Sequence, residues 1–142
     1  MEAKDLMFGD WVIINRCDKD LFVRFEGIDV CAKLKVPGEF GWEYRMFDKL
    51  KPVELTSEIL EKNGFNKGLY LAAQCYRKEA NHIVYSLLLE NGDQVVTLDY
   101  CNGKIELEVI TKGRGVNFDN VCYVHELQHA MRLCGIEKEI EL

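Results

Sequence analysis

The sequence QVVTLDYCNGKIELEVIT, which occupies residues 94–111, decides our assignment of the fold. Its central Asn102-Gly103 separates two stretches rich in β-branched residues. Asn-Gly is the strongest short hairpin signal, because a type I′ turn needs positive φ at both central residues. A second Asn-Gly pair lies eleven residues upstream, at 91–92. The two turns predict three antiparallel strands, over residues 82–90, 94–101 and 104–111.

The residues before and after this stretch extend the predicted sheet. A further strand over 69–77 makes a four-stranded antiparallel meander. In the strand over 104–111, apolar residues alternate with charged ones, which places Ile105, Leu107 and Val109 on one face and Lys104, Glu106 and Glu108 on the other.

A basic loop and a helix complete the C-terminal part. The loop, Lys112 to Gly115, matches no phosphate-binding motif. The helix is predicted over 120–134, with Asp119 or Asn120 as its cap and Gly135 at C′. We expect it to pack across the meander, and the alternating tail over 136–142 to add a short edge strand.

A short helix is predicted upstream of the meander, within residues 52–65. Thr56 is its N-cap, with Leu55 and Leu60 at the hydrophobic-staple positions. Gly64 supplies the left-handed C′ residue and Phe65 the apolar contact that follows it. This helix would link the two parts of the chain.

The N-terminal residues favour short strands separated by turns. One strand follows Gly9-Asp10, two occupy 21–35 with a break near Glu26-Gly27, and another over 41–48 carries Trp42, Tyr44 and Met46 on one face. Turns every 8–12 residues are typical of a small antiparallel barrel of SH3-like size. The aromatic residues here are expected to form mainly core, and some of them to line an exposed patch that suits a protein partner.

These assignments predict an α+β chain. Its first domain, 1–53, is a small antiparallel SH3-like β-barrel. Its second, 54–142, contains the linking helix, the four-stranded meander and the C-terminal helix packed on it.

Charge and composition narrow the classes of function. The 142 residues have a net charge of −6, with nine basic and ten acidic residues over 1–53 and nine against fourteen over 54–142. This balance makes nucleic-acid binding unlikely, because that binding needs a basic face. The N-terminus lacks a signal peptide, and no run of residues is long and apolar enough to span a membrane. We therefore expect a cytoplasmic protein that does not enter a membrane.

The six cysteines include no C-x-x-C pair. In an unsecreted chain, scattered cysteines are most simply buried, reduced thiols. A disulfide framework and a metal cluster are the alternatives to this interpretation.

One motif in the chain indicates a specific type of reaction. His125, Glu126 and His129 form H-E-x-x-H, whose histidines on a helix could hold zinc while the glutamate acts as general base. The predicted apolar stripe, however, turns both histidines toward solvent with Arg132 nearby. The extended pattern of a third histidine fails, leaving Glu137 and His82 as partners only if the fold brings them close.

The strand over 104–111 offers the other acidic pair, Glu106 and Glu108, with Asp99 expected nearby. Paired carboxylates can perform acid–base chemistry, but on an alternating strand they are typical of a solvated face. We therefore assign no catalytic, cofactor-binding or metal-binding residues and expect no cofactor.

Three stretches carry a resemblance to known proteins. They begin at Asp5, Pro52 and Tyr123 and read DLMFGDWV, PVELTSEILEKNGF and YVHELQ. In this order they resemble a group of small uncharacterised proteins from gut Bacteroides and their phages or mobile elements, to which no activity is attached. The helix of that group resembles V-H-x-L-Q-N, so His129 departs from its pattern.

The expected function is a non-enzymatic protein-interaction module of phage or mobile-element origin. Its partner would be an unknown protein or a second copy of the chain. The alternative is a zinc-dependent hydrolase that uses the H-E-x-x-H at 125–129.

Overall fold

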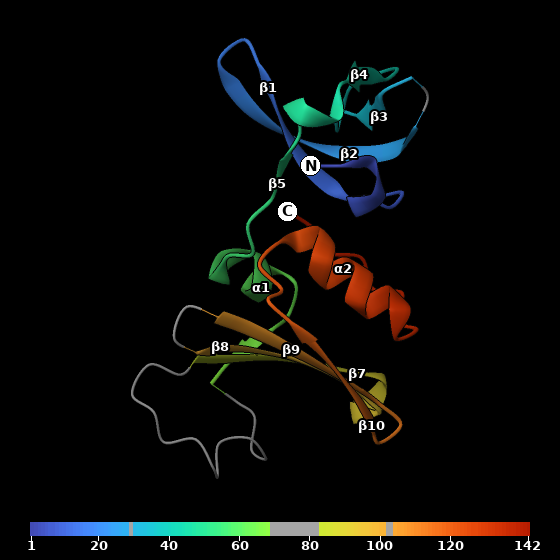
Figure 1. Cartoon of the computed structure of the whole chain (residues 1–142). Coiled ribbons are helices and arrows are strands. Elements are labelled where there is room, and N and C mark those ends of the chain that lie inside the picture. The colour runs from blue at the N-terminus through green and yellow to red at the C-terminus, as the bar shows by residue number, and fades with distance from the viewer. Residues whose placement is uncertain (29, 69–82, 102–103) are drawn as a thin grey trace. The chain divides into compact units, whose positions relative to one another are not determined.

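The computed structural model describes residues 1–28, 30–68, 83–101 and 104–142. It is an α+β structure with two antiparallel sheets and two α-helices (Figure 1). The chain divides into unit 1, Met1–Glu54 with Tyr123–His125, and unit 2, Leu55–Cys122 with Glu126–Leu142. Within these described parts, no helix has the length and apolar character needed to cross a membrane.

Unit 1 is built on a five-stranded antiparallel sheet with the order β4-β3-β2-β1-β5. The short 3-10 helix η1 precedes the sheet in sequence, and η2 lies between β4 and β5. The elements of this unit are η1 (Ala3–Asp5), β1 (Trp11–Arg16), β2 (Lys19–Ile28), β3 (Ala32–Lys35), β4 (Glu43–Arg45), η2 (Phe47–Lys49) and β5 (Lys51–Pro52).

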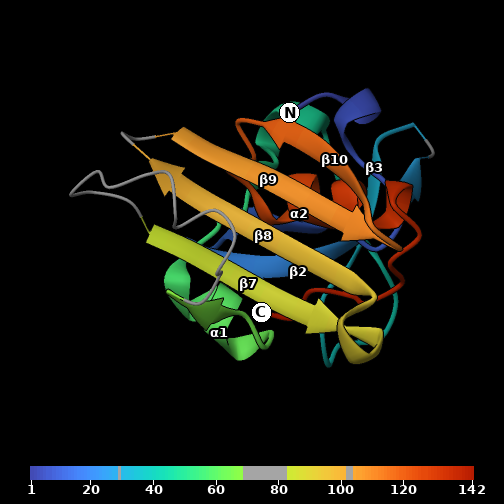
Figure 2. The same cartoon turned by 90° about the horizontal axis from the view of Figure 1, so that it is seen from below.

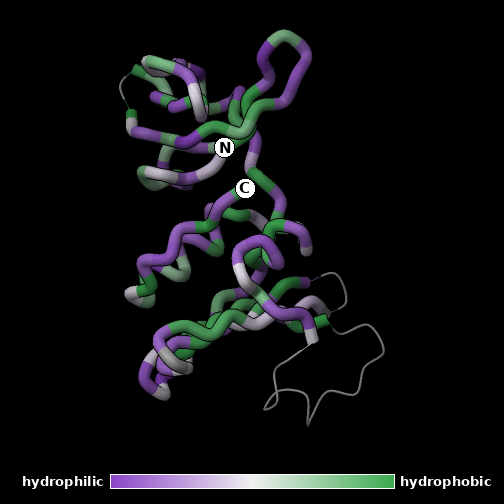
Figure 3. The backbone as a smooth tube through the Cα atoms, turned by 180° about the vertical axis from the view of Figure 1, so that it is seen from behind, coloured by the Kyte–Doolittle hydropathy of each residue, from purple (hydrophilic) through white to green (hydrophobic). Residues whose placement is uncertain are grey.

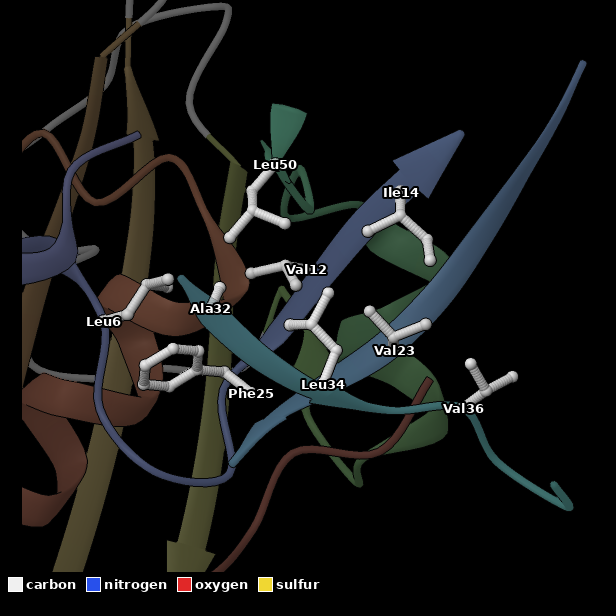
Figure 4. Packing of buried hydrophobic residues seen from close by; sticks show 9 residues of the cluster. All are labelled: Leu6, Val12, Ile14, Val23, Phe25, Ala32, Leu34, Val36 and Leu50. Atoms are coloured by element: carbon white, nitrogen blue, oxygen red, sulfur yellow. The ribbon is translucent and has the colours of Figure 1, made fainter. Parts of the chain in front are cut away.

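One face of this sheet carries the core of unit 1. Alternate residues of β1, β2 and β3 point to the same side, where Leu6 and Leu50 join them (Figure 4). Full burial of such a side chain stabilises the fold by about 1.5–3 kcal/mol. The cluster comprises Leu6, Val12, Ile14, Val23, Phe25, Ala32, Leu34, Val36 and Leu50.

The predicted SH3-like barrel is not confirmed, because this sheet is open, with β4 and β5 at its two edges. The predicted break near Glu26-Gly27 is a bulge: the register with β3 shifts between Phe25 and Gly27, while β2 continues to Ile28. A bulge keeps the pairing but kinks the strand. The strand predicted over 41–48 is shorter, because only Glu43–Arg45 pairs with β3.

Unit 2 contains the second five-stranded antiparallel sheet, in the order β10-β9-β8-β7-β6 (Figure 2). The predicted bounds of β8 and β9 are confirmed, and Leu107 and Val109 are buried while Lys104 and Glu106 are exposed. β7 and β8 are mostly hydrophobic along their middle (Figure 3). The strands are β6 (Asn66–Lys67), β7 (Ile83–Leu89), β8 (Gln94–Cys101), β9 (Lys104–Thr111) and β10 (Arg114–Asp119).

The turns around β8 differ from the prediction where they can be compared. Leu89 pairs with Gln94, so the β7–β8 connection is a four-residue loop that contains η3 (Glu90–Gly92) instead of a two-residue turn. Positive φ occurs at Glu90 and Gly92. The predicted strand over 69–77 and the Asn102-Gly103 turn lie outside the described residues.

Helix α1 (Ser57–Lys62) confirms its predicted caps. The Thr56 hydroxyl accepts a hydrogen bond from the Ile59 N–H at 3.3 Å. At the other end Gly64 has φ of +87°, and the Phe65 N–H donates to the Leu60 carbonyl. These are the bonds of a Schellman motif, which satisfies carbonyl groups that the helix end leaves open.

The predicted basic loop at 112–115 is wrong. Thr111 pairs with Arg114 across a two-residue turn, in which Lys112 and Gly113 both have positive φ, and β10 begins at Arg114. The sequence between this turn and Asp119 therefore extends the sheet. As a result, helix α2 (Val124–Leu133) begins four residues later than predicted. Residues 126–133 of α2 lie over one face of the sheet of unit 2 (Figures 1 and 2).

The tail over 136–142 does not form the predicted edge strand. It has no regular structure, and its Ile136 and Ile140 are buried. Two buried amide side chains bind its backbone instead: Gln128 bonds to Lys138 and Ile140, and Asn63 to Glu141. These side-chain bonds replace the ladder that a strand would have made.

Candidate functional site

Helix α2 presents the H-E-x-x-H motif differently from the prediction. His125 is only 6% exposed, and its ring stacks on that of Tyr123 with centroids 5.8 Å apart and planes 7° from parallel. The prediction that it lies on a solvated face is therefore wrong. The apolar stripe of α2 is wider than its sequence pattern indicates, since Gln128 and Ala130 are buried beside Leu127.

Glu126 serves the start of α2. Its Oε2 accepts a hydrogen bond from the backbone N–H of Cys122 at 2.8 Å. A carboxylate at this place satisfies an amide that precedes the helix and interacts favourably with the helix dipole. This structural role differs from that of a base directed at a bound water.

From the part of the chain that it describes, the structure brings no third ligand to the two histidines. Among the residues that it describes, no group of three or more His, Cys, Asp or Glu side chains could hold a metal ion. Of the two proposed partners, Glu137 joins no such group, and His82 falls outside the described residues. A catalytic zinc site has three protein ligands and an open position, so this geometry gives the motif no support.

The acidic residues of the second sheet are neighbours across the strands. Asp99 pairs with Glu106, which pairs on its other side with Asp119. The expectation that Asp99 lies near Glu106 and Glu108 is confirmed. Glu106 and Asp119 are exposed, as expected of a solvated face.

The exposed face of the sheet in unit 1 carries several partly exposed aromatic residues. We define the aromatic face as Trp11, Phe22, Trp42 and Tyr44 with Arg24 and Lys33. Cross-strand pairing places Trp11 opposite Arg24 and Lys33 opposite Tyr44, on the side of the sheet away from the core. Phe22, Trp42 and Tyr44 are each about half exposed.

Each of the two tryptophans of the aromatic face makes a cation–π contact. The Arg24 guanidinium lies 4.2 Å from the ring centroid of Trp11, and the Lys33 ammonium lies 3.9 Å from that of Trp42. The Trp42 indole N–H also donates to the carboxylate of Glu26 at 2.5 Å. Cation–π contacts of this kind contribute about 0.5–1 kcal/mol at exposed sites. They connect Trp11 to Arg24 of β2 and Trp42 to Lys33 of β3.

A cavity of about 330 Å³ adjoins the aromatic face at Trp42. Arg16 lines this cavity and donates to the Glu39 carboxylate with bonds of 2.8 and 3.1 Å. Glu39, and after it Glu43, raises the pKa of Arg16, so the guanidinium remains charged. The residues that line the cavity are Arg16, Val36, Glu39, Phe40, Gly41, Trp42 and Glu43.

The sequence predicted part of this surface. The strand pattern placed Trp42, Tyr44 and Met46 together, and all three are exposed. Phe22 was missed, although it alternates with the buried Val23 in β2. Phe40, one of the aromatic residues of this part that were expected to form mainly core, is fully exposed in the loop before β4.

The cysteines offer no reactive site among the described residues. Cys17, Cys31, Cys122 and Cys134 are all free thiols. The prediction that they are buried is wrong for Cys17 and Cys122, which are exposed; Cys17 stands in the positive-φ turn between β1 and β2. Burial raises the pKa of Cys134, which disfavours its thiolate.

With this geometry established, comparison with known proteins gives no relative from which a role could be taken. No protein-family model, no curated protein and no solved structure matches the chain.

Proposed function

We propose that this chain is a non-enzymatic protein-interaction module of phage or mobile-element origin, whose partner protein binds the aromatic face of unit 1. One observation carries the proposal. Aromatic rings gather on the solvent side of a sheet whose other side already holds the core. Exposed apolar clusters of this kind typically mark interaction sites.

The aromatic face can supply useful binding energy. An aromatic side chain buries about 150–250 Å² when fully covered. Covering the exposed halves of Phe22, Trp42 and Tyr44 would therefore remove on the order of 300 Å² of apolar area from water. At about 25 cal/mol per Å² this amounts to roughly 7 kcal/mol before the costs of association.

The charges of the face favour a protein partner over a nucleic acid. Arg24 and Lys33 already lie on tryptophan rings, and Glu26 adds a negative charge beside Trp42. Binding to a phosphate backbone depends on neutralisation by several cations. A protein surface that presents apolar residues beside one or two carboxylates fits this arrangement better.

The proposed origin rests on the resemblance to small proteins of gut Bacteroides and their phages or mobile elements. That resemblance also selects the experiment's source of partners, a Bacteroides lysate. A photo-crosslinking amino acid would replace Tyr44 in the intact chain. The matched control carries it in place of Leu133, an exposed apolar residue of α2.

We expect a discrete protein adduct from position 44, none from position 133, and loss of the adduct when Trp42→Ala is added. Urea unfolding of that variant checks that the fold is retained, which is expected because Trp42 is half exposed. An adduct that disappears after nuclease treatment would assign the face to nucleic acid. Equal adducts from both positions would show that the aromatic face has no special role.

A further inference from the structure

The four edges of the two sheets differ in length. In unit 1 the edge strands are β4, with three residues, and β5, with two residues ending in Pro52. In unit 2 the described edges are β6, with two residues, and β10, with six. Short strands and prolines are common protections against pairing with another chain. β10 has neither.

Among the described residues, β10 also lacks a bulge and a central charge, two other protections of an edge strand. Its pairing with β9 is continuous from Arg114 to Asp119, without a bulge. The charges lie at its two ends, and the four central residues, GVNF, have none. The strand is exposed along nearly its whole length, and Val116 is 46% exposed. Figure 2 shows β10 at the border of the sheet beside β9.

The turn before β10 determines which of its backbone groups point outward. Thr111 and Arg114 flank a two-residue turn, so they form a hydrogen-bonded pair. Hydrogen-bonded and non-hydrogen-bonded pairs alternate along an antiparallel ladder. The N–H and C=O groups of Gly115, Asn117 and Asp119 therefore point away from β9.

We propose that β10 pairs antiparallel with β10 of a second copy, joining the two sheets of unit 2 across a twofold axis at Asn117. This register opposes Asn117 to its equivalent and Gly115 to Asp119 of the other copy. Among antiparallel registers, it alone pairs all three outward-facing residues, which gives about six backbone hydrogen bonds.

The side chains of β10 suit this register. Val116 lies opposite Phe118 of the other copy, and the same contact repeats on the other side of the axis. Apolar–aromatic cross-strand pairs stabilise a sheet. Asp119 faces a glycine, and the two Asp119 carboxylates lie about four residues apart along the strands, roughly 13 Å. A second copy therefore complements both the backbone and the side chains of this edge.

The dimer is expected to be weak. One strand pair covers less area than a standard interface, so association should become visible between about 10 µM and about 1 mM. Sedimentation velocity over this range would show the monomer converting to a dimer. Growth should end at the dimer, because the twofold pairing occupies both β10 edges.

Two variants test the edge in different ways. Asn117→Pro removes an outward N–H without removing a bond to β9, and Val116→Lys places a charge on the edge. Both should remain monomeric at every concentration. The matched control, Leu88→Lys, places the same charge on β7, an inner strand of the same sheet where Leu88 is 60% exposed. It should dimerise as the wild type does.

Amide hydrogen exchange identifies the interface within the same samples. The amides of Gly115, Asn117 and Asp119 should become protected as the concentration rises, whereas those of Val116 and Phe118 should change little because they already bond to β9. A chain that stays monomeric, a dimer unaffected by both edge variants, protection elsewhere, or species that grow beyond the dimer would each overturn the proposal. Circular dichroism verifies that the variants fold. A variant that fails to fold leaves the wild-type exchange pattern as the deciding result.

Discussion

Gln128 offers the sharpest test of how unit 2 is held together. Its side chain is 3% exposed, its Nε2 donates to the Lys138 carbonyl at 2.9 Å, and its Oε1 accepts from the Ile140 N–H at 2.7 Å. This amide thus supplies two of the side-chain bonds that hold a tail with no strand partner. We predict that Gln128→Ala strongly destabilises the fold.

The magnitude follows from the groups that the substitution would leave behind. Ile140 is 1% exposed, so its N–H would remain buried without a partner, at a cost of about 1–3 kcal/mol. The Lys138 carbonyl belongs to a half-buried residue that water can reach, so its loss costs less. With the lost packing of the side chain, the free energy of unfolding should fall by about 2–4 kcal/mol. This is a large part of the roughly 5–15 kcal/mol that stabilises a typical domain.

Urea unfolding followed by circular dichroism measures this change. The midpoint should move to lower urea with an unchanged slope, since the surface exposed on unfolding stays similar. Gln94→Ala, which removes a half-buried glutamine at the start of β8, is the matched control and should cost less than about 1 kcal/mol.

A double-mutant cycle tests the proposed cause of the destabilisation by Gln128→Ala as well as its magnitude. In a chain that ends at Glu137, the groups bonded by Gln128 are absent, so Gln128→Ala should cost less than about 1 kcal/mol there. An equal cost in both backgrounds would refute the reasoning, because the effect would then not pass through the tail. The reasoning would also be refuted if Gln128→Ala in the full-length chain cost no more stability than Gln94→Ala.

Three further predictions concern other parts of the chain. Burial, with Tyr85 and Cys122 nearby, raises the pKa of Tyr100 to about 12 from 10.0. The stability linked to its neutral hydroxyl is therefore complete below pH 10 and is lost as the pH rises toward 12. Over that window, thermal unfolding should show the wild type losing about 1 kcal/mol relative to Tyr100→Phe, after discounting for partial exposure. A parallel loss in both chains would contradict this. Gly64→Ala should cost about 1–2 kcal/mol in urea unfolding, because alanine is strained at φ of +87°; an unchanged midpoint would count against a left-handed residue there. Mass spectrometry of the untagged protein should find no stoichiometric zinc, whereas one zinc per chain that vanishes in His129→Ala would revive the hydrolase.

Much of the secondary structure could be predicted where a local signal was sufficient. The bounds of β8 and β9 followed from alternation, and the caps of α1 from Thr56 and Gly64. These features depend on bonds between residues close in sequence. Local chemistry alone determines them.

The errors arose where the outcome depends on partners outside the segment itself. The residues over 114–119 contain glycine, asparagine and two charges, which resemble a loop, yet β9 supplies the partner that makes them a strand. The tail over 136–142 alternates as an edge strand does, but the side chains of Asn63 and Gln128 bind its backbone first. The residue pattern within these segments does not indicate such partners, so it could not predict the structure they adopt.

The candidate site shows the same division. Alternation along the strand predicted that Trp42 and Tyr44 share a face, which the pairing of β4 with β3 supports. It could not place Trp11 beside Arg24, since that contact needs the register of β1 against β2. Helical periodicity likewise placed His125 toward solvent, whereas its ring is buried and stacks on Tyr123.

The two proposed surfaces use different chemistry and can therefore be separated experimentally. The aromatic face offers side chains from a sheet whose backbone is already paired, whereas β10 offers backbone groups with few large side chains. Trp42→Ala should abolish crosslinking from position 44 and leave dimerisation intact, and Asn117→Pro should do the reverse. If both proposals hold, a dimer carries two aromatic faces, and its apparent affinity for an immobilised, repeated partner should exceed that of the Asn117→Pro monomer by about 10²-fold or more where the spacing permits both to bind. Equal apparent affinities would mean that the β10 dimer does not contribute to binding through the aromatic face.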